Sequence, residues 1–461
     1  MPSHATRTHV AAIVLAAGRG TRFRSSVPKV LHRAAGRTLL HHVLSAVRAL
    51  DVGQLVVIVA PDADDVRAEI DAVAGDEVTV VEQPSPRGTG HAVQCALAAL
   101  AEGVDRVLVV PGDTPLLTTD VLARLVDADG AGGALLTAHV DDPSGYGRVV
   151  RDGSFAVRVV EDADASDDEA LIEEINAGMY VFDRSRLQAG VADLAGDNAQ
   201  GELYLTDVVA GQHADGAPMA AVVADAAVVA GVNDRRQLAD AAAVLRRRHL
   251  DHLMLDGGVT VIDPATTYVD IDVEIGADTV VLPNTILDGG TRIGARVTIG
   301  PNSHLTACQV DDDATVHSTR AESAVIGAGA NVGPFAHLRR GTRLGPDTKA
   351  GAYVETKNVV VGAGSKIPHL SYVGDAVVGS GVNVACGVVT VNYDGQDKHV
   401  TTLEDGAFIG CDTMLVAPVT IGANAYTAAG SVITDDVPPG ALAIARSRQT
   451  IKEGWVDARR T

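Results

Sequence analysis

An apolar residue recurs at every sixth position over much of the segment 275–433. The longest uninterrupted run comprises Ile275, Val281, Leu287, Ile293, Ile299 and Leu305. Neither an α-helix, with its period of 3.6 residues, nor a strand, with its period of two, produces this spacing. A coil of three short flat strands does, because each strand can direct one small aliphatic side chain inward. The spacing therefore predicts a parallel β-helix.

Three further runs keep the same spacing. They are Ile326, Val332, Leu338, Leu344 and Ala350; Val361, Ile367 and Val373; and Ile409, Leu415, Ile421, Thr427 and Ile433. Ordinary hairpins, the alternative, would place apolar residues at every second position. Glycine follows many of the repeated residues, and we expect these glycines at the corners of the coils. A solenoid leaves broad flat faces, so side-by-side packing into an oligomer is expected.

Length and composition narrow the class of protein. A chain of 461 residues is long enough for two or more domains, and its net charge of -22 argues against nucleic acid or an anionic membrane as the main partner. The four cysteines show no CxxC pairing, which indicates a reducing compartment without a disulfide framework or structural zinc. No stretch approaches the ~20 apolar residues of a membrane span, and residues 1–10 lack a signal core. We expect a cytoplasmic protein.

The first predicted strand, Val10–Leu15, ends in a glycine-rich turn. Gly18 and Gly20 would let main-chain N–H groups approach a phosphate, and Arg22 adds a charged fork. Taken alone, this pattern fits a plain tight turn equally well. It matches neither the P-loop nor the three-glycine dinucleotide pattern.

The spacing of the following residues adds a resemblance. Leu15, Ala16, Ala17, Gly18, Gly20, Thr21 and Arg22, followed by Pro28 and Lys29, resemble the signature of the sugar-1-phosphate nucleotidyltransferases. The resemblance implies that Arg22 and Lys29 neutralise a nucleoside triphosphate during catalysis. It also implies that the segment 15–18 binds the nucleotide.

Strands and helices alternate through the first part of the chain, which favours a doubly wound sheet. Gln83 carries an amide donor and acceptor suited to reading a base edge, while Gly88 and Thr89 could meet the uracil or the ribose. Gly112 and Asp113 follow a predicted strand at 106–110, where ligands bind in open α/β sheets. Asp113 is the first expected magnesium ligand; its alternative role is a helix cap.

The next part of the chain resembles the sugar-binding half of the same family. The resemblance implies that Gly147 contacts the sugar through its backbone, and that Glu161 and Asn176 contact it through their side chains. The segment 201–207 is expected beside the sugar pocket. Asn233 resembles the second protein ligand to magnesium.

The carboxyl half carries motifs of its own, including Pro368-His369-Leu370-Ser371-Tyr372-Val373-Gly374-Asp375 and Val391-Asn392-Tyr393-Asp394-Gly395. With the first half, they resemble the bacterial bifunctional enzymes that acetylate glucosamine-1-phosphate and then uridylylate it. The resemblance implies His369 as general base, since an unperturbed histidine can accept a proton at cellular pH. It also implies two sets of contacts: Arg339, Lys357, Tyr372 and Asn383 to the sugar phosphate, and Cys386, Asn392, Tyr393, Cys411, Ala429 and Arg446 to acetyl-CoA.

Two positions depart from this pattern. Cys386 stands where the family has a small alanine, and Cys411 where it usually has serine. Near-equivalent size is one account of these cysteines, and a nucleophile that forms an acetyl-thioester is another. Pro111 and Arg87 are milder departures in the nucleotide pocket.

The predicted fold class is α/β plus all-β: a Rossmann-like nucleotidyltransferase domain followed by a left-handed parallel β-helix of hexapeptide repeats. The predicted domains are a uridylyltransferase domain (1–234), a helical linker (235–256) and an N-acetyltransferase domain with a tail (257–461). The resemblance implies glucosamine-1-phosphate, acetyl-CoA and UTP as substrates, Mg²⁺ as cofactor, a homotrimer, and UDP-N-acetylglucosamine as product for cell-wall synthesis. Two alternatives stay open: a nucleotidyltransferase that makes another nucleotide sugar, and a non-catalytic regulatory protein with the same pair of domains.

Overall fold

The computed structural model describes residues 7–18 and 20–460. Arg19, which belongs to the glycine-rich turn, and residues 1–6 of the segment searched for a signal lie outside the described residues. The chain divides into two compact units, residues 1–245 and 246–461. The division falls within one long helix, α9 (Arg235–Leu255), which occupies the predicted linker.

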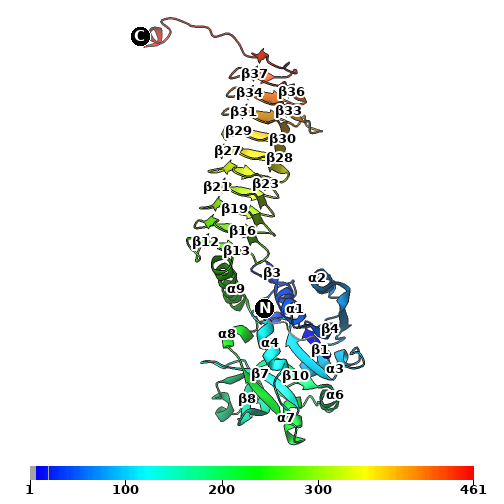
Figure 1. Cartoon of the computed structure of the whole chain (residues 1–461). Helices are drawn as coiled ribbons and strands as arrows, with labels where there is room; N and C mark the ends of the chain where they lie inside the picture. The colour runs from blue at the N-terminus through cyan, green and yellow to red at the C-terminus, as the bar shows by residue number, and fades with distance from the viewer. Residues whose placement is uncertain (1–6, 19, 461) are drawn as a thin grey trace. The chain divides into compact units, whose positions relative to one another are not determined.

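The first unit is built on a nine-stranded mixed sheet (Figure 1). Its strands, in spatial order, are β5 (Val78–Glu82), β4 (Val52–Val59), β1 (Arg7–Leu15), β6 (Arg106–Pro111), β10 (Glu174–Asp183), β7 (Gly133–His139), β11 (Met219–Val223), β9 (Phe155–Val160) and β8 (Arg148–Asp152). The first four are parallel, and β10 runs antiparallel to β6. The sheet thus begins with the parallel, doubly wound arrangement that the sequence predicts and continues into a half that contains antiparallel strands. A two-stranded hairpin, β2 (Arg33–Ala34) and β3 (Arg37–Thr38), lies apart from this sheet.

Helices cover both faces of the sheet because side chains alternate along each strand. Val10, Ala12 and Val14 of β1 belong to one apolar cluster, whereas Ala11 and Ile13 belong to the other. The first cluster includes residues of α1 (Leu39–Arg48), α2 (Asp64–Ala74) and α4 (Thr119–Val126), and the second includes residues of α3 (Thr89–Leu97), α6 (Arg184–Ala192) and α7 (Asp207–Ala214). Two single-turn helices, α5 (Asp167–Ala170) and α8 (Ala226–Val229), lie in connections.

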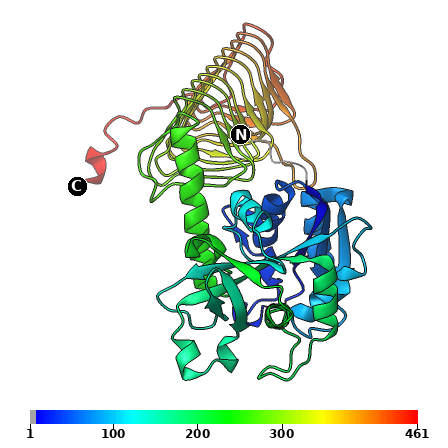
Figure 2. The ribbon, with the colours of Figure 1, turned by 60° about the horizontal axis from the view of Figure 1, so that its bottom comes forward.

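The second unit is a left-handed β-helix whose coils stack as a triangular prism (Figure 2). One sheet contains β12 (Thr260–Val261), β15 (Val280–Val281), β18 (Thr298–Ile299), β21 (Thr315–Val316), β24 (Asn331–Val332), β27 (Lys349–Ala352), β29 (Lys366–His369), β31 (Asn383–Val384), β34 (Phe408–Ile409), β37 (Tyr426–Thr427) and β39 (Leu442–Ala443). The other two faces hold β13 (Tyr268–Val269), β14 (Glu274–Ile275), β16 (Ile286–Asp288), β17 (Arg292–Ile293), β19 (His304–Thr306), β20 (Gln309–Val310), β22 (Arg320–Glu322), β23 (Val325–Ile326), β25 (His337–Leu338), β26 (Thr342–Leu344), β28 (Glu355–Val361), β30 (Tyr372–Val378), β32 (Val389–Val391), β33 (Thr401–Leu403), β35 (Met414–Val416), β36 (Val419–Ile421) and β38 (Val432–Ile433). Neighbouring coils pair in parallel.

The residues repeated every six positions form the core of this unit. Each of them is buried, and all but Thr427 belong to one continuous apolar cluster. The apparent gap between Leu305 and Ile326 is also part of the solenoid. Val310, Val316 and Ala321 fill it, but three of the four steps are five residues long.

The sequence predicts glycine at the corners for its backbone freedom, but the structure shows a different reason for it. Many left-handed corner positions hold other residues, such as Asp278, Asn284 and Arg296, all with positive φ. At Gly294 the reason is close stacking: an added Cβ would lie 2.7 Å from the backbone nitrogen of Asp312 on the next coil. Glycine is therefore required there by the approach of one backbone to another.

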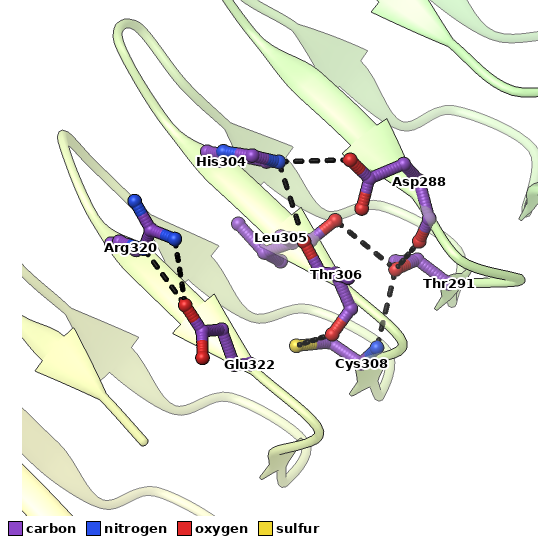
Figure 3. A network of polar contacts seen from close by, with 8 residues as sticks. All are labelled: Asp288, Thr291, His304, Leu305, Thr306, Cys308, Arg320 and Glu322. Atoms are coloured by element: carbon purple, nitrogen blue, oxygen red, sulfur yellow. Dashed lines mark hydrogen bonds and ion pairs between the residues drawn. The ribbon is translucent and has the colours of Figure 1, made fainter. Parts of the chain in front are cut away.

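Buried threonines satisfy backbone groups at other corners (Figure 3). The Thr291 hydroxyl donates to the carbonyl oxygens of Asp288 at 2.7 Å and Leu305 at 3.2 Å, and it accepts from the Cys308 backbone N–H at 3.2 Å. The same view shows the outer surface, where the His304 ring lies 2.9 Å from the Asp288 carboxylate. These two adjacent coils are thus tied together by side chains as well as by strand pairing.

Across residues 7–18 and 20–460, no helix combines the length and the apolar character that a bilayer span requires.

Candidate functional site

A cleft of about 540 Å³ opens in the first unit at the carboxyl ends of its parallel strands. Leu15 ends β1, Pro111 ends β6, and Gln83 directly follows β5, and all three line the cleft. Predicted residues that also line it are Ala17, Gly18, Lys29, Gly88, Thr89, Asp113, Glu161 and Asn176. The structure therefore brings most of the predicted nucleotide and sugar residues to one cavity.

Four charged or amide side chains meet at one end of this cleft. The Lys29 ammonium pairs with the Asp113 carboxylate and lies 3.2 Å from Asn233 Oδ1. The Arg22 guanidinium donates to the same oxygen of Asn233 at 3.1 Å. The backbone supports this meeting, because the Val232 N–H donates to the Asp113 carbonyl at 2.9 Å. Residues more than 200 positions apart in sequence are thus in contact.

These contacts test whether Asp113 and Asn233 fit a divalent cation. Both direct an oxygen at the same positive atom, Lys29 Nζ, which stands where a metal ion would be attracted. Carboxylate and amide oxygens are ligands of hard cations, and Mg²⁺ is usually bound by one or two such groups together with substrate phosphates. The donor set fits Mg²⁺.

Gln83 and Gly88 shape the adjoining part of the cleft. The buried Gln83 amide donates to the Gly88 carbonyl at 3.1 Å, so this side chain holds its own loop. Gly88 has a φ of 101° and precedes α3, with Leu203 of the facing segment packed against it. The Thr89 hydroxyl accepts from the Leu205 N–H at 3.2 Å. The segment 201–207 therefore forms a wall of the cleft.

Glu161 and Asn176, the predicted sugar contacts, line another part of the cleft. Burial raises the pKa of the Glu161 carboxyl above its usual range, although the Thr206 hydroxyl donates to it at 3.0 Å. Asn176 donates to the Tyr180 hydroxyl at 2.6 Å, and its backbone N–H donates to the Gly147 carbonyl at 2.8 Å. These groups provide hydrogen-bond partners for hydroxyls of a ligand.

Some predicted residues lie behind the cleft surface. Ala16 is buried and its N–H donates to the Ile58 carbonyl at 2.8 Å. The Gly112 N–H donates to the Leu15 carbonyl at 2.9 Å, so Gly112 joins two strand ends. Tyr180 and Thr206 line the cleft without a role assigned from sequence. Thr206 belongs to the segment 201–207 that was expected beside the sugar pocket, whereas nothing in the sequence singled out Tyr180.

The solenoid unit carries a cationic group on one face. Leu338 pairs with Thr356, and the same register continued by one residue places Arg339 beside Lys357 on the next coil. Lys357 in turn pairs with Gly374 of the coil after that. Lys398, from the segment 391–402 that leaves the coil, contacts Lys357 and lowers its pKa; Arg339 lowers it further by repulsion. Sequence reasoning missed Lys398, and the interrupted period of its loop was the available signal.

The loop that contains Asn392 and Tyr393 is anchored beside this group. Asp375 is buried, and it accepts hydrogen bonds from Asn392 and, at 2.7 Å, from Asn358. A hydrogen bond from His399 strongly lowers the pKa of Asp394 within the same loop. The loop is therefore held against the cationic coil by specific polar contacts, and Tyr393 is exposed on it.

A second group forms a column along β29, β31, β34 and β37. Lys366 pairs with Asn383, and the same register continued places His369 beside Cys386. Val384 pairs with Ile409 and Ile409 with Thr427, which aligns Cys386, Cys411 and Ala429 on successive coils. His369, Cys411, Ala429 and Arg446 are exposed, and Tyr372 and Asn383 are half-buried. One chain thus presents the predicted acetyl-site residues as two groups on different strands.

Comparisons with known proteins agree with both units. Residues 12–213 match the MobA-like NTP transferase domain, and residues 272–307 and 401–435 match the bacterial transferase hexapeptide (six repeats). The proteins called "Bifunctional protein GlmU" from Mycolicibacterium vanbaalenii and Mycolicibacterium gilvum are each 50% identical over 460 residues, which cover 98% of this chain and 93% and 92% of those proteins. The protein of the same name from Streptomyces avermitilis is 49% identical over 457 residues, covering 98% of this chain and 94% of the relative. From this identity over nearly its whole length, the chain belongs to the family of bifunctional GlmU proteins.

Proposed function

We propose that each unit carries one of two consecutive transfers. The solenoid moves the acetyl group of acetyl-CoA to the amine of glucosamine-1-phosphate. The α/β unit then moves UMP from UTP to N-acetylglucosamine-1-phosphate, which yields UDP-N-acetylglucosamine and pyrophosphate. The observation that carries this proposal is the concentration of cations at two places, around Lys29 and around Lys357, on a chain with a net charge of -22.

In the uridylyl transfer, a phosphate oxygen of the sugar phosphate attacks the α-phosphorus of UTP and pyrophosphate leaves. Two anions must approach each other, and Arg22 and Lys29 lower their repulsion. Mg²⁺ held by Asp113 and Asn233 would supply further positive charge at the phosphates. Gln83 and Gly88 hold the base end of the cleft, while Glu161 and Asn176 hydrogen-bond sugar hydroxyls.

In the acetyl transfer, His369 accepts the proton that the sugar amine loses as it attacks the thioester carbonyl. Arg339, Lys357 and Lys398 bind the sugar phosphate, which orients the amine. Tyr372 and Asn383 contact the sugar. The acetyl-CoA positions are Cys386, Asn392, Tyr393, Cys411, Ala429 and Arg446.

The two groups of acetyl-site residues support a homotrimer. In this proposal the cationic group of one chain faces the His369 column of a neighbour, which completes each site. Exposed aromatic pairs support such packing: the Phe335 and Tyr353 rings stack at 5.3 Å, and those of Phe408 and Tyr426 stack at 5.0 Å. Light scattering coupled to size-exclusion chromatography tests it, and a monomer that still transfers acetyl would contradict it. The same proposal places the protein in the cytoplasm, with its nucleotide and coenzyme substrates.

The deciding experiment is mass spectrometry of the products after incubation with glucosamine-1-phosphate, acetyl-CoA, UTP and Mg²⁺, with each component omitted in turn. We expect UDP-N-acetylglucosamine only in the complete mixture. Conversion of added N-acetylglucosamine-1-phosphate without use of acetyl-CoA would remove the acetyl half of the proposal. A nucleotide sugar from neither substrate would favour the regulatory alternative.

A further inference from the structure

Cys386 and Cys411 lie at the same corner of two adjacent coils. The Ala385 N–H donates to the Ile409 carbonyl at 2.9 Å, and the Asp412 N–H donates to the Cys386 carbonyl at 2.8 Å. Both bonds fit the register set by the pairing of Val384 with Ile409. The two cysteines are therefore direct neighbours across the ladder, although 24 other residues separate them in the chain (387 to 410).

This placement is within reach of a covalent bond. Neighbouring strands lie about 4.8 Å apart, and disulfides join residues whose Cα atoms lie about 4.4–6.8 Å apart. Cys386 is half-buried and Cys411 is exposed, so both thiols are open to small reagents, and both are free thiols in the structure. Equivalent corner positions on a regular solenoid also direct their side chains to the same side.

The other two thiols are less suited to oxidation. Cys308 is buried, and burial raises the pKa of its thiol. Desolvation also raises the pKa of the half-buried Cys95 thiol, which lies 3.9 Å from the His91 ring. Since the thiolate is the reacting form, Cys95 and Cys308 are expected to react slowly.

We propose that Cys386 and Cys411 form a reversible dithiol–disulfide pair that blocks acetyl-CoA binding when oxidised. The blocking step rests on the proposed function, which assigns both positions to the acetyl-CoA groove. The bond would draw the two side chains together beside His369. It would also close the segment 387–410, which contains the loop residues Asn392 and Tyr393.

The oxidant is a peroxide of the hydrogen peroxide class. The thiolate of one cysteine attacks the peroxide oxygen, which gives a sulfenic acid and water. The second thiol then attacks the sulfenic sulfur, which forms the S–S bond and releases a second water. Two thiols are oxidised and one peroxide is reduced. Exposed disulfides are the readily reduced ones, so a cellular dithiol would restore both cysteines.

The test treats the full-length protein with hydrogen peroxide, alkylates the remaining thiols and maps the peptides by mass spectrometry without reduction. We expect a linked pair of peptides containing Cys386 and Cys411, an unchanged mass of the intact chain on non-reducing gels, and loss of the link with dithiothreitol. Separate alkylation of both cysteines after oxidation, or a link between two chains, would overturn the proposal. This readout needs no enzymatic activity.

The rate of acetyl transfer is measured on the same samples. For each protein, the rate after oxidation is divided by the rate in the reduced state. We expect at least a tenfold fall for the natural chain and no fall for Cys411→Ser, whatever the starting rate of that variant. Cys95→Ser is the matched control and should keep the full response. If the disulfide-linked protein acetylates as fast as the dithiol form, the blocking step is overturned. If the dithiol form itself transfers no acetyl group, the proposed function is contradicted instead.

Discussion

The two units assemble their candidate sites by different routes. In the α/β unit, Arg22 and Lys29 come from the connection after β1, whereas Asp113 and Asn233 come from two other parts of the chain; the four meet because a mixed sheet brings strand ends together. In the solenoid, His369, Cys386 and Cys411 meet because they occupy the same position on successive coils. A site of the first kind depends on the whole fold of its unit, and one of the second kind depends on the local register.

The largest effect is expected for His369→Ala. Loss of the general base should lower acetyl transfer about 10²–10⁴-fold. Uridylyl transfer should stay at its natural rate, because the substituted residue lies in the other unit. Release of coenzyme A thiol and release of pyrophosphate measure the two reactions separately. A parallel fall in both rates would mean that the units do not work independently.

Asp113→Asn is the counterpart in the α/β unit. Removing the carboxylate should lower uridylyl transfer about 10²–10³-fold, the scale seen when a group that stabilises transition-state charge is lost. Acetyl transfer should be unchanged, and a chelator added to the natural protein should reproduce this pattern. Equal uridylyl rates with Asp and Asn at this position would remove Asp113 from the proposed metal site.

Ile299→Ala tests the local character of the solenoid. The side chain is fully buried in the coil core, so the free energy of unfolding should fall by about 2–5 kcal/mol. Ile299→Val, the milder control, should cost about 0.5–1.5 kcal/mol. Thermal unfolding followed by circular dichroism measures both. Uridylyl transfer at low temperature should not change, and its loss would show that the units share their stability.

The smallest effect is expected for Lys398→Gln. Removing this ammonium should raise the KM for glucosamine-1-phosphate about tenfold, equal to about 1.4 kcal/mol of binding, with little change in kcat. The same substitution relieves the contact that lowers the pKa of Lys357, so the pKa of Lys357 should rise. Acetyl transfer over a range of pH and salt measures both effects. Lys452→Gln, in the tail, is the control for general charge loss.

Much of the solenoid could be predicted because its period is visible residue by residue. Every repeated apolar residue is buried as expected, and α9 (Arg235–Leu255) lies within the predicted helical linker 235–256. The coils between Leu305 and Ile326 could not be recognised, since their five-residue steps break the period. Gly294 follows a repeated apolar residue, as the sequence pattern indicates. The reason for glycine there is the close approach of the next coil's backbone and not a positive φ, and this reason is visible only in three dimensions.

The two candidate sites could also be predicted only in part. The family motif pointed to Lys29, Asp113 and Asn233, yet nothing in the sequence shows that their side chains share one contact point. Lys398 was missed because its loop has no register from which to infer a neighbour. The alignment of Cys386 with Cys411 was also hidden, because the loop between them lengthens their coil beyond the usual spacing.

The stacking of coils also has a mechanical consequence. Val280 pairs with Thr298 one coil later, so a coil takes up 18 residues of chain (280 to 298). Each coil is paired with its immediate neighbours alone, and stability in such arrays is approximately a sum over adjacent repeats. A pulling force applied to the carboxyl end should therefore peel off one coil at a time. Each step should release about 60 Å of extended chain, with one larger step where the loop 391–402 is included.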